Sequence, residues 1–318
     1  MNTVNRTFLF IFFAFVVTFQ QLLPATLVYS MRIRRSFALD IPSAKKKKHF
    51  LVSAVPILYK RTRAINDIRL SLPVNIYEKN TIGGTLFNVR YVPSKKWWFE
   101  VTTGIEKETV VATGTSSFTV SRTGLDDIIF AGGHTKFLSK HAQFGMYAIG
   151  GIPAERKVQP LELYNTLVGT RFFSVGAGAE FSYSFINSLP RTVFVVGQVR
   201  GLHFFDRRWT PILPADATIQ PGDVIDVLCA FNYREKRNIV EAGYSPTFFV
   251  HQAVKLPEQT VRGPNFVRHS VYATATHVFM KSYVLKKPLI LGIGTNFSWA
   301  HRFNTRIVTC WLNATYVF

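Results

Sequence analysis

The sequence predicts an all-β fold, a single antiparallel transmembrane β-barrel. Apolar and polar residues alternate with a period of two through many segments, which is typical of strands with two different faces. Several of these segments reach the ~9–11 residues of a tilted membrane strand. The connections between them alternate between short and long, as in membrane barrels that have short turns at one end and longer loops at the other.

The composition fits a membrane barrel better than a helical membrane protein. The chain has 318 residues and is 47% hydrophobic, but after residue 30 it has no apolar run close to the ~20 residues of a membrane helix. Its 29 phenylalanines and 14% aromatic content would suit aromatic girdles at the two membrane interfaces. An aromatic-rich soluble periplasmic β protein is the alternative that composition leaves open.

The charge and the cysteines restrict the ligands to be expected. The formal net charge is +20, but only residues 45–48 form a dense basic run, whereas nucleic-acid binders usually gather their charge on one face. We therefore expect no nucleic acid partner. The two cysteines, Cys229 and Cys310, give neither a metal-ligand spacing nor a disulfide framework. No metal and no cofactor are expected.

The amino terminus reads as a secretory signal peptide over residues 1–30. Arg6 precedes an apolar core at residues 8–19, and Val28 and Ser30 have the small-residue spacing of a cleavage site before Met31. An uncleaved anchor helix is the alternative, although the core is short for a membrane span. If residues 1–30 form a signal peptide, the chain is exported to the cell envelope.

Residues 31–65 are predicted to form a basic periplasmic arm or a plug segment, and residues 66–318 the barrel. The arm contains the runs RIRR and KKKK, which read as a solvated, flexible segment. Residues 50–63 allow three readings: a plug segment, an extra strand or a short lead-in to the barrel.

Within residues 66–318 the alternation predicts about twelve strands, in a range of about 10–14. They are expected near residues 68–77, 85–91, 97–106, 124–137, 143–148, 173–185, 193–200, 225–233, 240–248, 270–279, 289–299 and 304–318. Small, polar and charged residues occupy one face of these segments, and apolar and aromatic residues occupy the other. Parity alone does not say which face points outward.

The connections supply the orientation. Short ones are expected near residues 93–96, 138–141, 187–190, 234–237 and 283–287, and long ones near 107–123, 153–167, 206–222 and 251–266. With a periplasmic carboxy terminus, every short connection falls on the periplasmic side and every long one outside. The segments 78–84 and 300–305 are exceptions, since they would be short outer loops.

The last strand resembles the closing strand of bacterial outer-membrane β-barrels. Its aromatic and apolar residues recur at every second position back from the end, through Phe318, Tyr316, Ala314 and Leu312. The resemblance implies an outer-membrane location and surrounding outer-membrane lipids. It also implies that Leu312, Tyr316 and Phe318 form the signal for the barrel-assembly machinery.

A second resemblance lies at residues 124–138, GLDDIIFAGGHTKFL. This segment is similar to the G-L-G-D-(I/V) strand opening of outer-membrane barrels associated with phenol-degradation operons, which are similar to the FadL-like hydrocarbon transporters. Asp126 stands in place of the second glycine, and residues 150–153 loosely match the GVKLPTG-like segment that follows. The resemblance implies uptake of small molecules, with hydrophobic ones as candidates.

The predicted inner face carries the candidate functional residues. They are Arg69, Arg90, Glu100, Asp127, Glu180, Gln198, Arg200, Asp226 and Glu241. Such charges could line a pore and bias its ion selectivity, or pair across neighbouring strands and close a narrow barrel. Basic residues in the short turns, among them Lys95, Lys96 and Lys140, could contact inner-leaflet phosphates or remain solvated.

Passive passage of small solutes through a narrow lumen is the function that we predict. The alternative is a non-transporting surface barrel whose long outer loops bind partners. We expect no enzymatic activity, because the chain has no GxSxG or HExxH motif. Three histidines on the predicted outer face, His134, His203 and His277, are the candidates for a lipase-like reading.

Overall fold

A computed structural model of the protein describes residues 49–65, 76–113, 117–154, 172–188, 191–208, 218–255, 259–263, 265–280, 287–300 and 305–318. The predicted signal peptide, residues 31–48 of the predicted arm and Arg69 lie outside these residues. In the described part of the chain, no helix is long and apolar enough to cross a membrane.

The described residues form a closed barrel of twelve antiparallel strands. Its wall contains β1 (His49–Ile65), β2 (Ile76–Val92), β3 (Trp97–Thr113), β4 (Ser117–Leu125), β5 (Ile128–Phe137), β6 (Ala142–Ile152), β7 (Ser174–Ser188), β8 (Arg191–Phe204), β11 (Gly222–Glu235), β12 (Asn238–Tyr244), β13 (Thr247–Val250), β16 (Phe266–Phe279), β17 (Leu289–Ala300) and β18 (Thr305–Val317). β4 and β5 are two halves of one wall strand, and so are β12 and β13, because each pair runs along the same neighbours. The predicted number of about twelve is confirmed for the barrel, but β1 supplies one of the twelve from outside residues 66–318, and β2 takes in residues of both strands predicted at 68–77 and 85–91.

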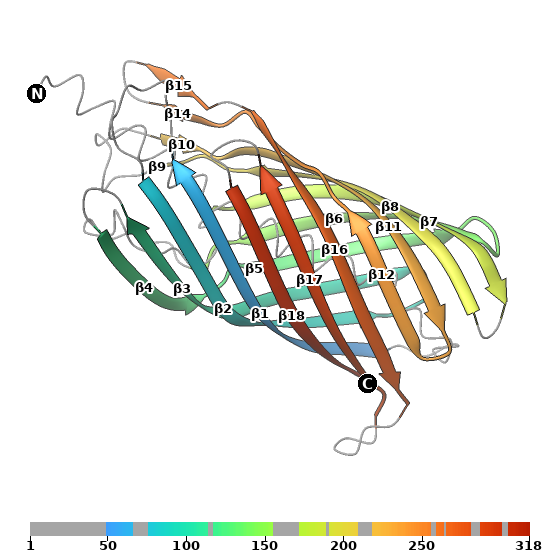
Figure 1. Ribbon diagram of the computed structural model, residues 1–318. Coiled ribbons are helices and arrows are strands. Elements are labelled where there is room, and N and C mark those ends of the chain that lie inside the picture. Colours follow the sequence, from blue (N-terminus) through green and yellow to red (C-terminus); the bar gives the residue numbers. More distant parts are fainter. Residues whose placement is uncertain are drawn as a thin grey trace, which may run out of the picture.

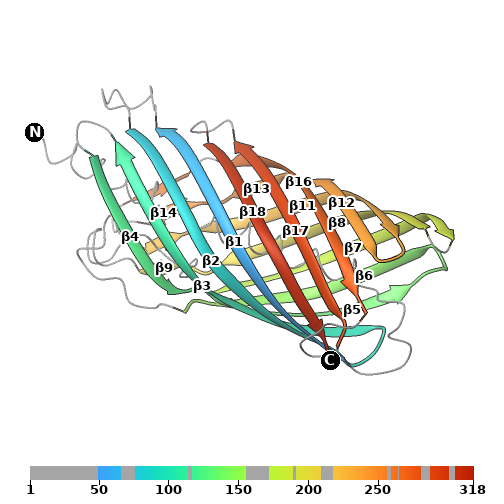
Figure 2. The ribbon, with the colours of Figure 1, turned by 60° about the horizontal axis from the view of Figure 1, so that its bottom comes forward.

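The barrel closes where its first strand meets its last one. β1 and β18 pair in a register that runs from Leu51 opposite Val317 to Thr62 opposite Arg306, and they lie side by side in both ribbon views (Figures 1 and 2). Phe50 and Phe318 exchange two backbone hydrogen bonds of 2.8 and 3.0 Å at the end of this joint. The predicted carboxy-terminal strand is therefore the closing strand.

The barrel begins earlier than the sequence indicated. His49–Ile65 is a wall strand paired on both sides, so the boundary predicted at residue 66 is wrong and the extra-strand reading of residues 50–63 is the right one. Pro56 lies within this strand, although proline lacks a ladder donor. In the structure the β1–β18 pairing is interrupted at Val55 and Pro56, and the strand continues on both sides of the gap.

Short connections gather at the end of the barrel that holds Phe318, which we call the turn end. They join β2 to β3, β5 to β6, β7 to β8 and β11 to β12, and the last of these turns on Lys236 with a positive φ of 51°. The predicted long loop at residues 107–123 is wrong, since β3 and β4 continue as a paired hairpin to Thr113 and Ser117. The predicted loop at residues 78–84 lies within β2.

The opposite end, the loop end, carries a second small sheet. β9 (Arg207–Arg208) and β10 (Thr218–Gln220) lie between β8 and β11, and β14 (Ala253–Lys255) and β15 (Thr260–Arg262) lie between β13 and β16. These four strands pair in the order β15-β14-β10-β9, away from the carboxy terminus (Figure 1). The sheet thus joins two connections that were predicted as long outer loops.

We expect Thr309→Pro to prevent closure of the barrel. Thr309 lies in β18 opposite Tyr59 of β1 and Asn296 of β17, and proline would remove its N–H from the ladder. The matched control is Thr309→Val, which keeps the N–H and the side-chain shape. After refolding in detergent, the proline variant should lose the heat-dependent gel shift of a folded barrel and the valine variant should keep it. A folded proline variant would contradict the importance of this joint.

Candidate functional site

The two faces of the wall have opposite chemistry. The outward face carries exposed apolar side chains such as Leu58, Met146 and Ile293, each more than half exposed, whereas Arg61, Glu100 and Arg200 on the inner face are at most 5% exposed. Soluble proteins show the reverse arrangement. Since apolar outer faces and polar interiors are typical of membrane barrels, the outer surface is the lipid-facing one and the interior is the candidate functional site.

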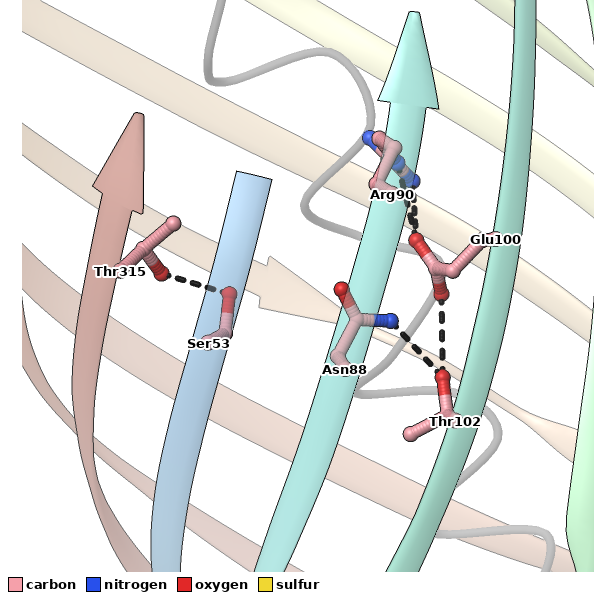
Figure 3. Close-up of polar contacts among 6 residues, drawn as sticks. All are labelled: Ser53, Asn88, Arg90, Glu100, Thr102 and Thr315. Atoms are coloured by element: carbon pink, nitrogen blue, oxygen red, sulfur yellow. Dashed lines mark hydrogen bonds and ion pairs between the residues drawn. The ribbon is translucent and has the colours of Figure 1, made fainter. Parts of the chain in front are cut away.

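One buried ion pair lies inside the wall near the turn end. Arg90 of β2 and Glu100 of β3 stand directly opposite each other, with Nη2 and Oε2 separated by 2.7 Å (Figure 3). The guanidinium also lies 4.7 Å from the centre of the Trp98 ring, a cation–π arrangement. Both charges are therefore compensated by neighbouring strands.

Polar side chains extend this pair along the same strands. The Thr102 hydroxyl donates to Glu100, and the Asn88 amide donates to Thr102 over 2.7 Å. At the barrel closure itself, the Ser53 and Thr315 hydroxyls are 2.8 Å apart and link β1 to β18. Figure 3 shows these six side chains on their four neighbouring strands.

A second polar network crosses four strands on the far side of the barrel. Arg200 of β8 pairs with Asp226 of β11, its direct neighbour in the register. Asp226 also accepts a hydrogen bond from Thr247 of β13. Arg268 of β16 donates to Thr247 over 3.4 Å and lies 5.5 Å from the Phe249 ring centre.

The structure places the other predicted lumen residues as follows. Glu241 accepts a hydrogen bond from the Tyr272 hydroxyl, and Gln198 donates to the Tyr147 hydroxyl over 2.6 Å. Glu180 and Asp127 are buried, and Asp127 lies at the break between β4 and β5 rather than inside a strand. The predicted residues thus form groups instead of one ring. Glu180, Arg200 and Asp226 interact electrostatically with Tyr147, the hydrogen-bond partner of Gln198, whereas Arg90 and Glu100 form a pair elsewhere in the wall. In the described residues, no cluster of His, Cys, Asp and Glu is arranged to hold a metal ion.

An apolar cluster fills the interior between these polar groups, and the sequence analysis missed it. Its members come from opposite sides of the ring of strands: Val55, Ile57, Tyr59, Ile82 and Leu86 from β1 and β2, Ile307 and Trp311 from β18, Val196 from β8, Leu228 and Ala230 from β11, and Tyr272 from β16, with Phe194 packed against them. We call this group the apolar constriction. Residues 193–196 and 227–231 are apolar at both odd and even positions. This pattern was the signal in the sequence that could have revealed the cluster.

Comparison with solved structures identifies the fold. The crystal structure of the COG4313 outer-membrane channel from Pseudomonas putida F1 matches with a TM-score of 0.56 and 12% identity, over 84% of this chain and 95% of that one. The chain has the fold of an outer-membrane β-barrel. The identity is low, so the match shows the fold alone, and the predicted resemblance to outer-membrane channels is confirmed at that level.

Two further structures resemble the barrel more distantly. The transport unit of the autotransporter AIDA-I from Escherichia coli matches with a TM-score of 0.48 and 8% identity, over 93% of this chain and 98% of that one. The monoaromatic hydrocarbon channel CymD matches with a TM-score of 0.38 and 9% identity, over 88% and 91%. Both TM-scores are too low to show a shared fold. In sequence comparisons, no family model and no curated protein matches the barrel.

We expect Glu100→Ala to destabilise the barrel by about 3 kcal/mol or more, because removal of one partner leaves a buried charge uncompensated. The double variant Arg90→Met with Glu100→Leu should cost less than Glu100→Ala alone, since it removes both charges and keeps apolar volume. Urea unfolding of the barrel in lipid vesicles measures both free energies of unfolding. A double variant that is less stable than the single one would contradict the pairing.

Proposed function

We propose that the barrel gives small apolar molecules a passive path across the outer membrane. The observation that carries the proposal is the apolar constriction, in which side chains from opposite walls meet inside the lumen. The structural likeness to an outer-membrane channel agrees with a transport role. That the solute is small and apolar is itself part of what we propose.

The constriction would select against ions. An ion that enters an apolar constriction must lose its hydration shell, and such constrictions can close a pore by dewetting. Arg90 and Arg200 do not offset this loss, because both already have carboxylate partners. An apolar molecule meets no comparable barrier, since its transfer from water to an apolar surface is favourable.

A binding role for the outer surface is the second candidate. The small sheet of β9, β10, β14 and β15 links two connections at the loop end, and Lys255 forms a 2.6 Å ion pair with Asp206 across them. Such a sheet would present an ordered surface to a partner, with or without transport through the lumen. Partner binding that survives a blocked lumen would favour this candidate.

We propose no catalytic role for the outward histidines. His134 packs against the Trp97 ring at a centroid distance of 4.7 Å, His203 contacts Asp223 over 2.7 Å, and His277 contacts Asn238 over 2.7 Å. Each of the three histidines therefore has a neighbouring side chain that accounts for its position. A phospholipase activity that is lost in His277→Ala would overturn this assignment.

Widening the constriction should open the lumen to ions. We expect the wild-type protein to show little conductance in a planar bilayer and Trp311→Ala with Leu228→Ala to show discrete conductance steps. The control is Phe231→Ala with Val308→Ala, which removes apolar volume from exposed, outward positions of the same two strands. Equal conductance of the two double variants, or uptake of a small aromatic compound into vesicles no faster with wild-type protein than without protein, would refute the proposal.

A further inference from the structure

A hollow of about 470 Å³ lies in the wall formed by β5, β6, β7 and β8, within the ~300–1,000 Å³ range of small-molecule sites. Glycines and alanines form much of its lining, among them Gly132, Ala148, Ala177 and Gly201. Ala148 and Ala177 stand opposite each other on β6 and β7, and Gly201 stands opposite Ala177 on β8. Three neighbouring strands therefore lack large outward side chains at the same level.

The hollow opens toward lipid and has a floor. Met146 and Val199 on its sides are 59% and 47% exposed on the outward face. From the inside, the Tyr147 ring lies so close to Gly178 that a Cβ there would come within 2.4 Å of it. Tyr147 is held in place by the 2.6 Å hydrogen bond to Gln198. The hollow is thus a surface groove that an apolar chain could enter from the membrane.

The groove starts at the turn end of the barrel. Trp97, which is half exposed, lines it and is the first residue of β3 after the turn at residues 93–96. His134 packs edge-on against this ring. Aromatic residues with a polar atom favour the level of the lipid headgroups. Trp97 therefore marks the interface of the leaflet on the turn side.

Lysines surround the same edge. Lys95, Lys96 and Lys136 are exposed, and the Thr135 N–H donates to the Lys96 carbonyl over 2.7 Å, which places the turn beside Lys136. Residues 93–99 and 128–145, which form this edge, contain no Asp or Glu. The edge is cationic, and its position just beyond Trp97 is where lipid phosphates would lie.

We propose that the groove and the lysines together hold one anionic phospholipid of the phosphatidylglycerol type from the leaflet on the turn side. One acyl chain lies in the groove, and the headgroup phosphate lies between Lys96 and Lys136. The apolar groove accounts for a bound chain, and the cationic edge accounts for a preference for negative headgroups. The site lies outside the lumen and is independent of the proposed transport.

Quenching of Trp97 fluorescence tests the proposal. The full barrel is refolded into phosphatidylcholine vesicles that contain a fixed fraction of acyl-brominated phosphatidylglycerol or acyl-brominated phosphatidylcholine. The difference between wild type and Trp97→Phe isolates the signal of Trp97 from the other tryptophans. We expect stronger quenching by the brominated phosphatidylglycerol. Equal quenching by the two lipids would overturn the proposal, because it would show ordinary contact with bulk lipid.

Charge variants test the headgroup site. Lys96→Gln with Lys136→Gln should lower the preference for phosphatidylglycerol by roughly tenfold or more, at about fivefold for each lysine near a membrane surface. The control is Arg237→Gln with Lys287→Gln, which removes two exposed charges from other turns at the same end. If both variants lost the preference for phosphatidylglycerol equally, the preference would come from general surface charge, and a defined site would be refuted.

A filling variant tests the groove. Ala177→Leu should reduce the quenching of Trp97 by brominated phosphatidylglycerol, because the added side chain would occupy the centre of the hollow. Its control is Ala273→Leu, at an exposed outward position of β16. The heat-dependent gel shift establishes that each variant is folded. Unchanged quenching in a folded Ala177→Leu variant would refute the placement of the chain.

Discussion

The whole molecule depends on the closure of one backbone hydrogen-bond ladder. In the hydrocarbon core no water is present to satisfy an unpaired N–H or C=O, so a sheet can cross the membrane only when it has no edges. Here the joint between β1 and β18 removes the last two edges, and the final hydrogen bonds of the joint involve Phe50 and Phe318. The first and last strands of the wall, which lie far apart in the sequence, must therefore pair before the barrel is closed.

A closed ladder fixes the register, and the register determines the interior. Arg90 stands opposite Glu100 and Arg200 opposite Asp226, so each of these four charges meets its counterion on the adjacent strand. A shift of one residue would turn every side chain to the other face and would put these charges in lipid. The ion pairs are thus best understood as a consequence of the register that the apolar outer face already imposes.

The sequence predicted those features that lipid imposes directly. Outward positions must be apolar, so the alternation through Phe318, Tyr316 and Leu312 identified the closing strand and its faces. At residues 107–123 this constraint is weaker, because β3 and β4 carry polar residues on both parities there. That hairpin therefore reads as a loop. β1 was ambiguous for a different reason, since Pro56 and the basic residues at its end interrupt the pattern of a strand whose inner face holds Ser53 and Arg61 as well as apolar residues.

Side-chain partners across more than one strand could not be predicted without the spatial order. Tyr147 of β6 reaches Gln198 of β8 because the intervening residue on β7 is Gly178, which has no side chain to block the ring. Alternation gives the parity of each of these residues, but neither the register nor the role of the glycine. The members of the apolar constriction could not be predicted either, because they share their parity with polar residues of the inner face.

The contrast between the paired charges and the apolar constriction explains how a twelve-stranded barrel can be narrow. Barrels of about eight strands are filled by side chains, whereas those of 16–18 strands leave an aqueous channel. With twelve strands the walls need large side chains to meet, and Trp311 of β18, Tyr59 of β1 and Tyr272 of β16 supply three of them. Because Arg90 and Arg200 already have carboxylate partners, the size and polarity of this constriction, rather than these charges, would govern what passes.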